Sequence, residues 1–217
     1  MTGESAGALA RYKWAALIPV KEPRLGKSRL NAVLGESERI ALNVSLACRT
    51  FDICAEAMGA AACVVVTSSG TVSAEAARRG LRVVPEPSDG GLNRALAAAG
   101  TAALGSGAQA LVVVPTDLVR LGADALLAVI DALPAGGGCV LAPDRHGTGT
   151  NAMALAPGRV DLFRFGADSL LAHRDVVAAA GLALATLEDA RLALDLDLPE
   201  DLDLWRSGLA PGRHQAS

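Results

Sequence analysis

Seven short apolar runs recur along the chain, and Ala-rich stretches with helical spacing separate the first five of them. Each run is continuously apolar over most of its length rather than alternating, which is typical of strands covered on both faces. Alternating strands and helices of this kind predict an α/β fold with a mostly parallel sheet flanked by helices. The runs are AALIPV (15–20), CVVVTS (63–68), LRVVPEP (81–87), ALVVVP (110–115), CVLAPD (139–144), NAMALAP (151–157) and LALAT (182–186).

The chain of 217 residues contains no internal repeat and no linker, so we expect one domain over residues 14–207. The ends, 1–13 and 208–217, read as flexible tails. The N-terminus lacks a basic start followed by an apolar signal core, and no apolar run is long enough to span a membrane. The four cysteines are scattered and form no CxxC pair, which favours a reducing, cytoplasmic setting.

Composition bears on the class of partner. Aromatic residues make up 3% of the chain, the net charge is −3, and no basic stripe is present. Nucleic-acid surfaces need stacking aromatics or clustered Lys and Arg, so neither DNA nor RNA is an expected partner. An anionic small molecule needs only a few local donors and stays compatible with this composition.

Parallel α/β sheets bind ligands beyond the carboxyl ends of their strands. All five segments that this rule selects carry acidic residues, and three carry glycines. They are KEPRLGKSRL (21–30), PSDGGLN (87–93), PTDL (115–118), DRHGTGTN (144–151) and LDLDLPED (194–201).

The first of these segments is one residue short of a phosphate-binding P-loop. Gly26, Lys27 and Ser28 fit G-x-x-x-x-G-K-[ST], but Lys21 stands where the first glycine belongs and Pro23 removes a backbone amide. A true P-loop is therefore not expected. Four cations, Lys21, Arg24, Lys27 and Arg29, still favour a cradle for a triphosphate, with a solvated basic loop as the alternative.

Two acidic elements are candidates for a divalent cation. Asp117 ends the fourth strand, where a carboxylate is well placed to hold a cation that bridges phosphates; helix capping is the alternative. Asp195 and Asp197 face one side if their run is extended, and two converging carboxylates call for a cation between them. Asp197, Pro199 and Glu200 also match a helix start with a capping box.

A glycine-rich segment and the start of a helix are candidates for an anion site. Gly147 and Gly149 permit a backbone that exposes amides, although a plain hairpin turn is the alternative. Gly166 and Ser169 lead into an amphipathic helix, and the start of a helix can bind an anion. Ordinary capping of the helix is the alternative. His173, four residues further on, is expected to be a structural histidine.

Taken in order, IPVKEPRLGKSRL, DGGLN, VVVPTDL, DRHGTGTNAM, FGADSLLAH and LDLDLPEDL resemble the phosphoenolpyruvate/2-phospho-L-lactate guanylyltransferases of coenzyme F-420 biosynthesis. The likeness runs from about Trp14 to Trp205. It implies a GT-A-like nucleotidyltransferase fold with a mixed central sheet. In such folds the first loop binds nucleotide phosphates without being a P-loop.

The resemblance also implies an activity: transfer of GMP from GTP to the phosphate of a three-carbon phospho-acid, with release of pyrophosphate. We expect phosphoenolpyruvate as the acceptor and 2-phospho-L-lactate as the alternative. A nucleotidyltransferase with another phosphorylated acceptor and a silent nucleotide-binding module are the competing interpretations. By matching motifs, the resemblance implies that Mg²⁺ is held by Asp117, Asp195 and Asp197. It implies that the acceptor is bound by Thr150, Gly166 and Ser169, and the nucleotide by Lys21, Arg24 and Lys27.

The catalytic groups expected from these assignments are Lys21, Lys27 and Asp117. The sequence does not identify the residues that select guanine. PSDGGLN is the best candidate for the base side, with Gly91 and with Asn93, whose amide both donates and accepts. A homodimer is also compatible with the sequence.

Overall fold

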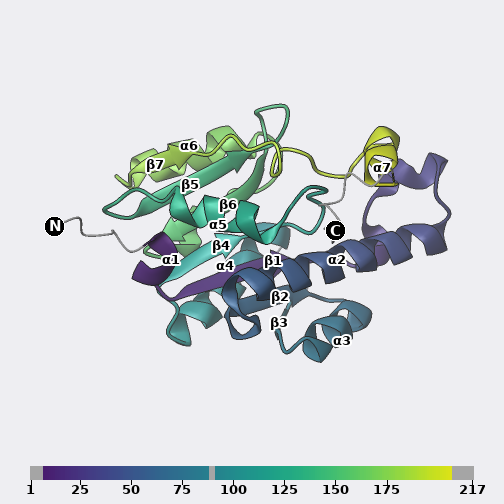
Figure 1. The fold of residues 1–217 in the computed structure, drawn as a ribbon, viewed down its shortest axis with the longest axis horizontal. Helices are drawn as coiled ribbons and strands as arrows, with labels where there is room; N and C mark the ends of the chain where they lie inside the picture. The colour runs from purple at the N-terminus through teal and green to yellow at the C-terminus, as the bar shows by residue number, and fades with distance from the viewer. Residues whose placement is uncertain (1–6, 88–90, 207–217) are drawn as a thin grey trace, which may run out of the picture.

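The structure is a computed structural model that describes residues 7–87 and 91–206. Its centre is a seven-stranded sheet with the order β3-β2-β1-β4-β6-β5-β7 (Figure 1). All seven predicted strands are present, namely β1 (Trp14–Pro19), β2 (Cys63–Thr67), β3 (Arg82–Pro85), β4 (Ala110–Val113), β5 (Gly138–Pro143), β6 (Thr150–Ala156) and β7 (Leu184–Thr186).

One strand makes the sheet mixed. The pairs β1–β2, β2–β3, β1–β4 and β5–β7 are parallel, whereas β6 runs antiparallel to both β4 and β5. A short loop without a helix joins β5 to β6, and a connection of that length returns the chain in the opposite direction. The predicted mostly parallel, mixed sheet is confirmed.

The predicted helical stretches between the first five strands all form helices, whereas the first helix, Ala8–Arg11, lies in the segment predicted to be a flexible tail. The helices are α1 (Ala8–Arg11), α2 (Glu36–Met58), α3 (Gly70–Arg78), α4 (Gly91–Gly105), α5 (Ala123–Asp131), α6 (Ser169–Ala179) and α7 (Pro199–Arg206). Short 3₁₀ segments lie at Pro23–Leu25, Ser28–Ala32, Ala60–Ala62 and Val160–Leu162. No helix of the described residues is long and apolar enough to cross a bilayer.

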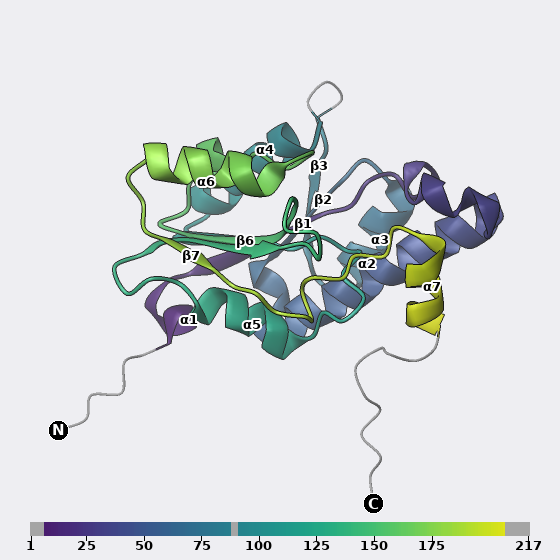
Figure 2. The same cartoon turned by 90° about the horizontal axis from the view of Figure 1, so that it is seen from above.

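Two apolar layers explain why the central strands are continuously apolar. Ala16 and Ile18 of β1 pack in the layer with α2, α3 and α5, while the alternate residues Ala15 and Leu17 pack beneath α4 and α6. Figure 2 shows α4 and α6 on one side of the sheet and α5 and α2 on the other. Both faces of each central strand are therefore buried.

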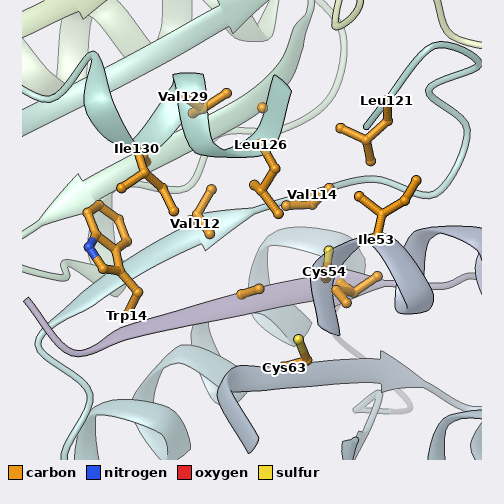
Figure 3. Close-up of a cluster of buried hydrophobic side chains, with 14 of the residues drawn as sticks. Trp14, Ile53, Cys54, Cys63, Val112, Val114, Leu121, Leu126, Val129 and Ile130 are labelled. Atoms are coloured by element: carbon orange, nitrogen blue, oxygen red, sulfur yellow. The ribbon is translucent and has the colours of Figure 1, made fainter. Parts of the chain in front are cut away.

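Cysteines take part in the first of these layers. Figure 3 shows Cys54 of α2 next to Cys63 of β2, and both belong to the cluster that contains Val112, Leu126 and Ile130. Cys54, Cys63 and Cys139 are buried, and burial raises the pKa of Cys63 and of Cys139 to about 12. Protonated thiols of this kind act as small apolar side chains.

The domain begins earlier than the predicted boundary at Trp14. Ala8 is buried, Trp14 Nε1 donates a hydrogen bond of 3.0 Å to the Ala8 carbonyl, and Arg11 reaches the Ala135 carbonyl at 2.8 Å. The segment from Ala8 therefore packs on the domain, because Trp14 needs a partner for its indole N–H. Residues 1–6 and the predicted tail at 208–217 lie outside the described residues.

A third, smaller apolar cluster joins segments that are distant in the sequence. Leu30 and Leu34 pack with Val119, Leu196 and Leu202. In Figures 1 and 2, α7 accordingly lies against the segment that follows β1. This cluster holds the 21–34 segment and the LDLD run next to the end of β4.

Candidate active site

The sheet brings the predicted segments to one edge. The parallel strands β1 to β5 end there, and the antiparallel β6 starts there with Thr150, which pairs with Pro143 at the end of β5. A cavity of about 610 Å³ lies at this edge. Five of the predicted site residues line it: Lys21, Lys27, Gly91, Asp117 and Asp197.

The loop after β1 is fastened to α2. Asn43 Nδ2 donates to the Pro23 carbonyl at 2.8 Å, and Arg39 donates to the Gly26 carbonyl at 2.9 Å. A Cβ at Gly26 would lie 2.7 Å from Asn43 Nδ2, so only glycine permits this approach. The α-helix starts at Glu36 and not at Lys27, which confirms that the loop is not a P-loop.

Lys27 is the centre of the charged part of the site. Its backbone adopts the left-handed conformation with φ 55°, and its side chain is 8% exposed. The ammonium lies 2.7 Å from Asp117 Oδ2 and 3.0 Å from Asp197 Oδ1. Burial alone lowers the pKa of Lys27, but the two carboxylates outweigh it and the pKa is raised. Lys27 is therefore a fixed positive charge between two acidic segments.

The two acidic segments are paired through their backbones. Leu118 and Asp195 form an antiparallel bridge, Leu196 N–H donates to the Asp117 carbonyl at 2.9 Å, and Val119 N–H donates to the Leu194 carbonyl at 3.0 Å. Burial, and then repulsion from Asp117, raises the pKa of Asp195. Asp117 and Asp197 therefore share Lys27 at the cavity, whereas Asp195 lies near enough to repel both carboxylates but does not line the cavity.

A divalent cation fits this donor set in part. Within residues 7–87 and 91–206, no three His, Cys, Asp or Glu side chains are grouped so that they hold an ion by themselves. Magnesium in nucleotide sites usually takes only one or two carboxylates, with substrate phosphates and water completing its shell. Asp117 and Asp197, which both line the cavity, provide that number of carboxylates. Asp195 as a third ligand of Mg²⁺ stays a prediction.

On the other side of the edge, Thr150, Ser169 and His173 form a buried hydrogen-bonded group. The Thr150 N–H donates to Ser169 Oγ at 2.9 Å, and Thr150 Oγ1 lies 2.9 Å from His173 Nδ1. His173 Nε2 accepts the Arg164 N–H at 2.9 Å, so Nε2 carries no proton. The neutral ring therefore holds its proton on Nδ1 and donates it to Thr150 Oγ1. The hydroxyl proton of Thr150 remains available for a ligand.

The charge state of His173 supports that arrangement. Burial, helped by the positive charge of Arg164, lowers the pKa of His173 to about 4. The ring is fully buried and lies edge-on to Phe165, with ring centroids 4.7 Å apart. The prediction of a structural histidine is consistent with this burial, and the structure adds that this histidine orients a residue of the predicted acceptor site.

Asn93 has another role than the predicted one. Its Nδ2 donates to the Phe165 carbonyl at 2.9 Å and its Oδ1 accepts the Phe165 N–H at 2.7 Å. It does not line the cavity. Because both ends of its amide are occupied, Asn93 is not suited to read a base; it holds the backbone next to Gly166, which is exposed.

Arg24 is the other predicted residue that the structure places differently. Its side chain is exposed and does not line the cavity, although its carbonyl accepts a hydrogen bond of 3.4 Å from Arg39. Pro23, next to it, starts a short 3₁₀ turn in this loop. A basic residue in the loop is therefore not automatically a ligand of the site.

The sequence interpretation missed the ion pair of Arg145 with Asp201. The two side chains meet through bonds of 2.6 and 3.1 Å, and Asp201 is fully buried. Asp201 Oδ2 also accepts the N–H groups of Asp197 and Leu198 at 2.9 and 2.7 Å. The capping carboxylate of α7 is thus Asp201, whereas Asp197 is free to pair with Lys27. Both residues were visible in segments already selected, but no local pattern pairs them.

Comparison with known proteins shows the family of this chain. The profile of the family described as "Guanylyl transferase CofC like" matches residues 14–205. The chain belongs to this family. It is 38% identical over 188 residues to the phosphoenolpyruvate guanylyltransferase of Sphaerobacter thermophilus, which covers 87% of this chain and 90% of that relative. It is 34% identical over 187 residues to the protein of the same name from Rubrobacter xylanophilus, with 86% and 90% covered.

The likeness of fold extends further than the likeness of sequence. A nucleotidyl transferase from Methanothermobacter thermautotroptrophicus superposes with a TM-score of 0.61 at 15% identity, covering 91% of this chain and 97% of that one. At this identity only the fold is shared. The predicted nucleotidyltransferase fold and the predicted family are both confirmed.

Proposed function

We propose that this guanylyl transferase family member transfers GMP from GTP to phosphoenolpyruvate and releases pyrophosphate, in the biosynthesis of coenzyme F-420. The observation that carries the proposal is the cavity at the carboxyl edge, where Lys27 joins Asp117 to Asp197. Two curated relatives that share most of the chain are named phosphoenolpyruvate guanylyltransferase. The cytoplasmic setting expected from the cysteines remains part of this proposal.

The reaction is a nucleotidyl transfer. An oxygen of the acceptor phosphate forms a bond to the α-phosphorus of GTP while the bond from that phosphorus to the β-phosphate oxygen breaks. The acceptor phosphate is already ionised, so no side chain needs to remove a proton. Transfers of this type depend mainly on positioning and on neutralising charge. The residues of the cavity are suited to both tasks.

Lys21 and Lys27 act on the nucleotide in this proposal. Both line the cavity, and their positive charges offset the charge of the triphosphate and of the departing pyrophosphate. Asp117, Asp195 and Asp197 would hold Mg²⁺. When bound, that ion supplies additional neutralisation of phosphate charge. Arg145 and Asp201 fix the backbone of Asp197 and thereby its direction.

The acceptor is held by neutral donors in this proposal. The Thr150 hydroxyl, the Ser169 hydroxyl and the backbone at Gly166 lie around the start of β6 and of α6. Their hydrogen bonds suit the carboxylate of the acceptor, because they bind an anion without attracting the triphosphate as an arginine would. The acceptor phosphate is then left for the charged part of the site.

The experiment is incubation with GTP, Mg²⁺ and one acceptor at a time, followed by measurement of pyrophosphate. Release that depends on phosphoenolpyruvate supports the proposal, and faster release with 2-phospho-L-lactate assigns that acceptor instead. Release with neither, but with another phosphorylated acceptor, rejects the substrate and keeps the reaction class. If GTP binds and no acceptor releases pyrophosphate, the chain is a silent nucleotide-binding module. Light scattering of the same sample tests the predicted homodimer.

A further inference from the structure

The cavity is extended along the sheet edge, and its two ends differ. The strand order β3-β2-β1-β4 places Glu86, which follows β3, and Asp117, which follows β4, on opposite sides of β2 and β1. Three strand spacings amount to about 14 Å. Both residues line the same cavity. A ligand that fills it therefore needs an elongated shape with different chemistry at its two ends, as a nucleoside triphosphate has.

The end at Asp117 takes the phosphates in this orientation. Lys27, with Asp117 and Asp197, contributes the buried charge there, and Lys21 follows β1. Charged groups of this kind interact with phosphate and its cation rather than with a base. The base must then lie toward β3.

Glu86 is held firmly at the β3 end. Its N–H donates to the Thr67 carbonyl at 3.3 Å, which extends the pairing of β3 with β2 by one residue. The residue is half-buried and lines the cavity. Among the residues that the structure describes, none makes a hydrogen bond or an ion pair with its carboxylate. A partly desolvated carboxylate without a partner is costly, so a ligand with N–H donors is favoured at this point.

Apolar side chains surround the same part of the cavity. Val66 lies one residue before the end of β2, and Leu92 and Ala95 come from α4, which packs over β1 and β2. Leu92 is 42% exposed. Leu25, from the loop after β1, also lines the cavity and is 63% exposed. Exposed leucines that line a cavity mark a surface that an apolar, planar group covers on binding.

We propose that Glu86 selects guanine, by accepting hydrogen bonds from the N1–H and the 2-amino group of the base. This inference rests on the proposed use of GTP and identifies the residue that confers the specificity. The two donors of guanine are adjacent on one edge, and a carboxylate accepts both of them. Adenine presents an unprotonated N1 at the corresponding position, and cytosine an unprotonated N3. Both would place a lone pair against the negative charge of Glu86.

The proposal replaces Asn93 for a physical reason. The Asn93 amide is already bonded at both ends to Phe165, whereas the Glu86 carboxylate has no partner within residues 7–87 and 91–206. Because the group that recognises the base is charged, we expect a large difference in affinity between guanine and other bases. Loss of the 2-amino group, as in ITP, should weaken binding about tenfold to a hundredfold.

The test is isothermal titration of GTP, ITP, ATP and XTP, each with Mg²⁺ and without acceptor. Three proteins are compared: wild type, Glu86→Gln and Glu56→Gln. Glu56 is exposed on α2 and does not line the cavity, so its variant controls for the lost charge. Xanthine has a carbonyl where guanine has the 2-amino group. A glutamine at position 86 accepts from N1–H and donates to that carbonyl.

Wild type and Glu56→Gln should bind GTP at least tenfold more tightly than ITP and should bind ATP and XTP weakly. In Glu86→Gln, the preference for GTP over ITP should fall below about threefold. The affinity for XTP relative to that for GTP should rise at least tenfold. If Glu86→Gln melts at a lower temperature, Glu86→Ala serves as the second variant and should lose the GTP preference without the gain for XTP.

Two outcomes contradict the inference in different ways. If both Glu86 variants keep the wild-type ratios of affinity for GTP, ITP and XTP, another group recognises the base. The proposed binding of GTP would not be affected by that result. If the wild type binds none of the four nucleotides, the proposed function is wrong and the inference falls with it. Lys27→Met separates the two ends of the ligand, since it should weaken all four nucleotides and leave their ratios unchanged.

Discussion

The nucleotide side of the edge (Lys21, Lys27, Asp117, Asp195 and Asp197) and the acceptor side (Thr150, Gly166, Ser169 and His173) hold their polar groups in different ways. On the nucleotide side, the Asp117 and Asp197 side chains are 30% and 40% exposed around the Lys27 ammonium. On the acceptor side, Thr150, Ser169 and His173 are 8%, 2% and 0% exposed.

This difference separates two kinds of binding. The nucleotide side presents opposite charges near solvent, and such groups exchange partners readily when a charged ligand arrives. The acceptor side consists of neutral groups that hydrogen-bond one another, with one tautomer of His173, and this arrangement leaves the Thr150 hydroxyl proton for a ligand. Groups fixed before binding lose little entropy when the ligand arrives. We therefore expect substitutions on the first side to change the rate and those on the second side to change acceptor affinity.

The largest expected effect belongs to the carboxylates of the nucleotide side. Asp117→Ala and Asp195→Ala should each lower kcat on the order of a hundredfold or more, because each removes charge that the proposed transition state requires. Both residues are partly exposed, so folding should be preserved. Rates at saturating Mg²⁺, with thermal melts as the control, check this. Unchanged rates in both variants would contradict the metal assignment and remove the contrast between the two sides.

The next effect is a pH dependence that comes from the acceptor side. His173 has a pKa of about 4 in the fold and about 6.5 in the unfolded chain. Between these values the unfolded chain binds more protons, so the free energy of unfolding decreases as the pH falls from 6.5 toward 4. The loss from this group approaches about 3 kcal/mol near pH 4.

Denaturant unfolding from pH 7 down to pH 4.5 measures this dependence. Other carboxylates titrate in the same range, so the quantity of interest is the difference between wild type and His173→Gln. The exposed His146 supplies the matched control His146→Gln, which should follow the wild type. A wild-type curve that coincides with that of His173→Gln would mean that His173 is not held neutral, and the fixed tautomer would be lost with it.

A smaller effect is expected when a single donor of the acceptor side is removed. Thr150→Val keeps the shape and removes the hydroxyl, and Ser169→Ala removes the acceptor of the Thr150 N–H. Each should weaken acceptor binding about tenfold and leave GTP binding nearly unchanged. Thr148→Val, at an exposed position two residues earlier, is the control. Titration of GTP and of acceptor on each variant distinguishes the sides, and a loss confined to GTP would reverse the assignment.

The sequence predicted the fold well because the determining signals are local. The runs of β1, β2, β4, β5 and β6 are continuously apolar since both faces of these strands are buried, and that pattern is readable without tertiary information. The edge strands β3 and β7 are less buried. The parallel strands then place their carboxyl ends at one edge, which brought Lys27, Asp117 and Asp197 together in the prediction as they are in the structure.

The remaining features depend on contacts between distant parts of the chain. Asn93 and Phe165 are 72 residues apart, and Arg145 and Asp201 are 56 apart. Nothing in the segment PSDGGLN shows that the Asn93 amide is already occupied, so its polar character alone made it a candidate for the base. Glu86 was overlooked for the converse reason, because it precedes that segment within an apolar run and only the cavity shows what it faces.

The smallest expected effect tests whether exposure, rather than charge alone, separates the cations of the first loop. Arg29 is 70% exposed at its side chain and lies 3.5 Å from Asp197, whereas Lys27 is 8% exposed and contacts two carboxylates. Exposed ion pairs contribute about 0.2–1 kcal/mol, so Arg29→Ala should change the KM for GTP by less than about fivefold. The change should vanish in 0.5 M salt, since exposed charges are screened. Lys27→Met, measured in parallel, should raise the KM for GTP by a much larger factor, and this change should persist in 0.5 M salt. If Arg29→Ala is as damaging as Lys27→Met, then the exposed cations grip the triphosphate, and burial of Lys27 serves the fold rather than the reaction.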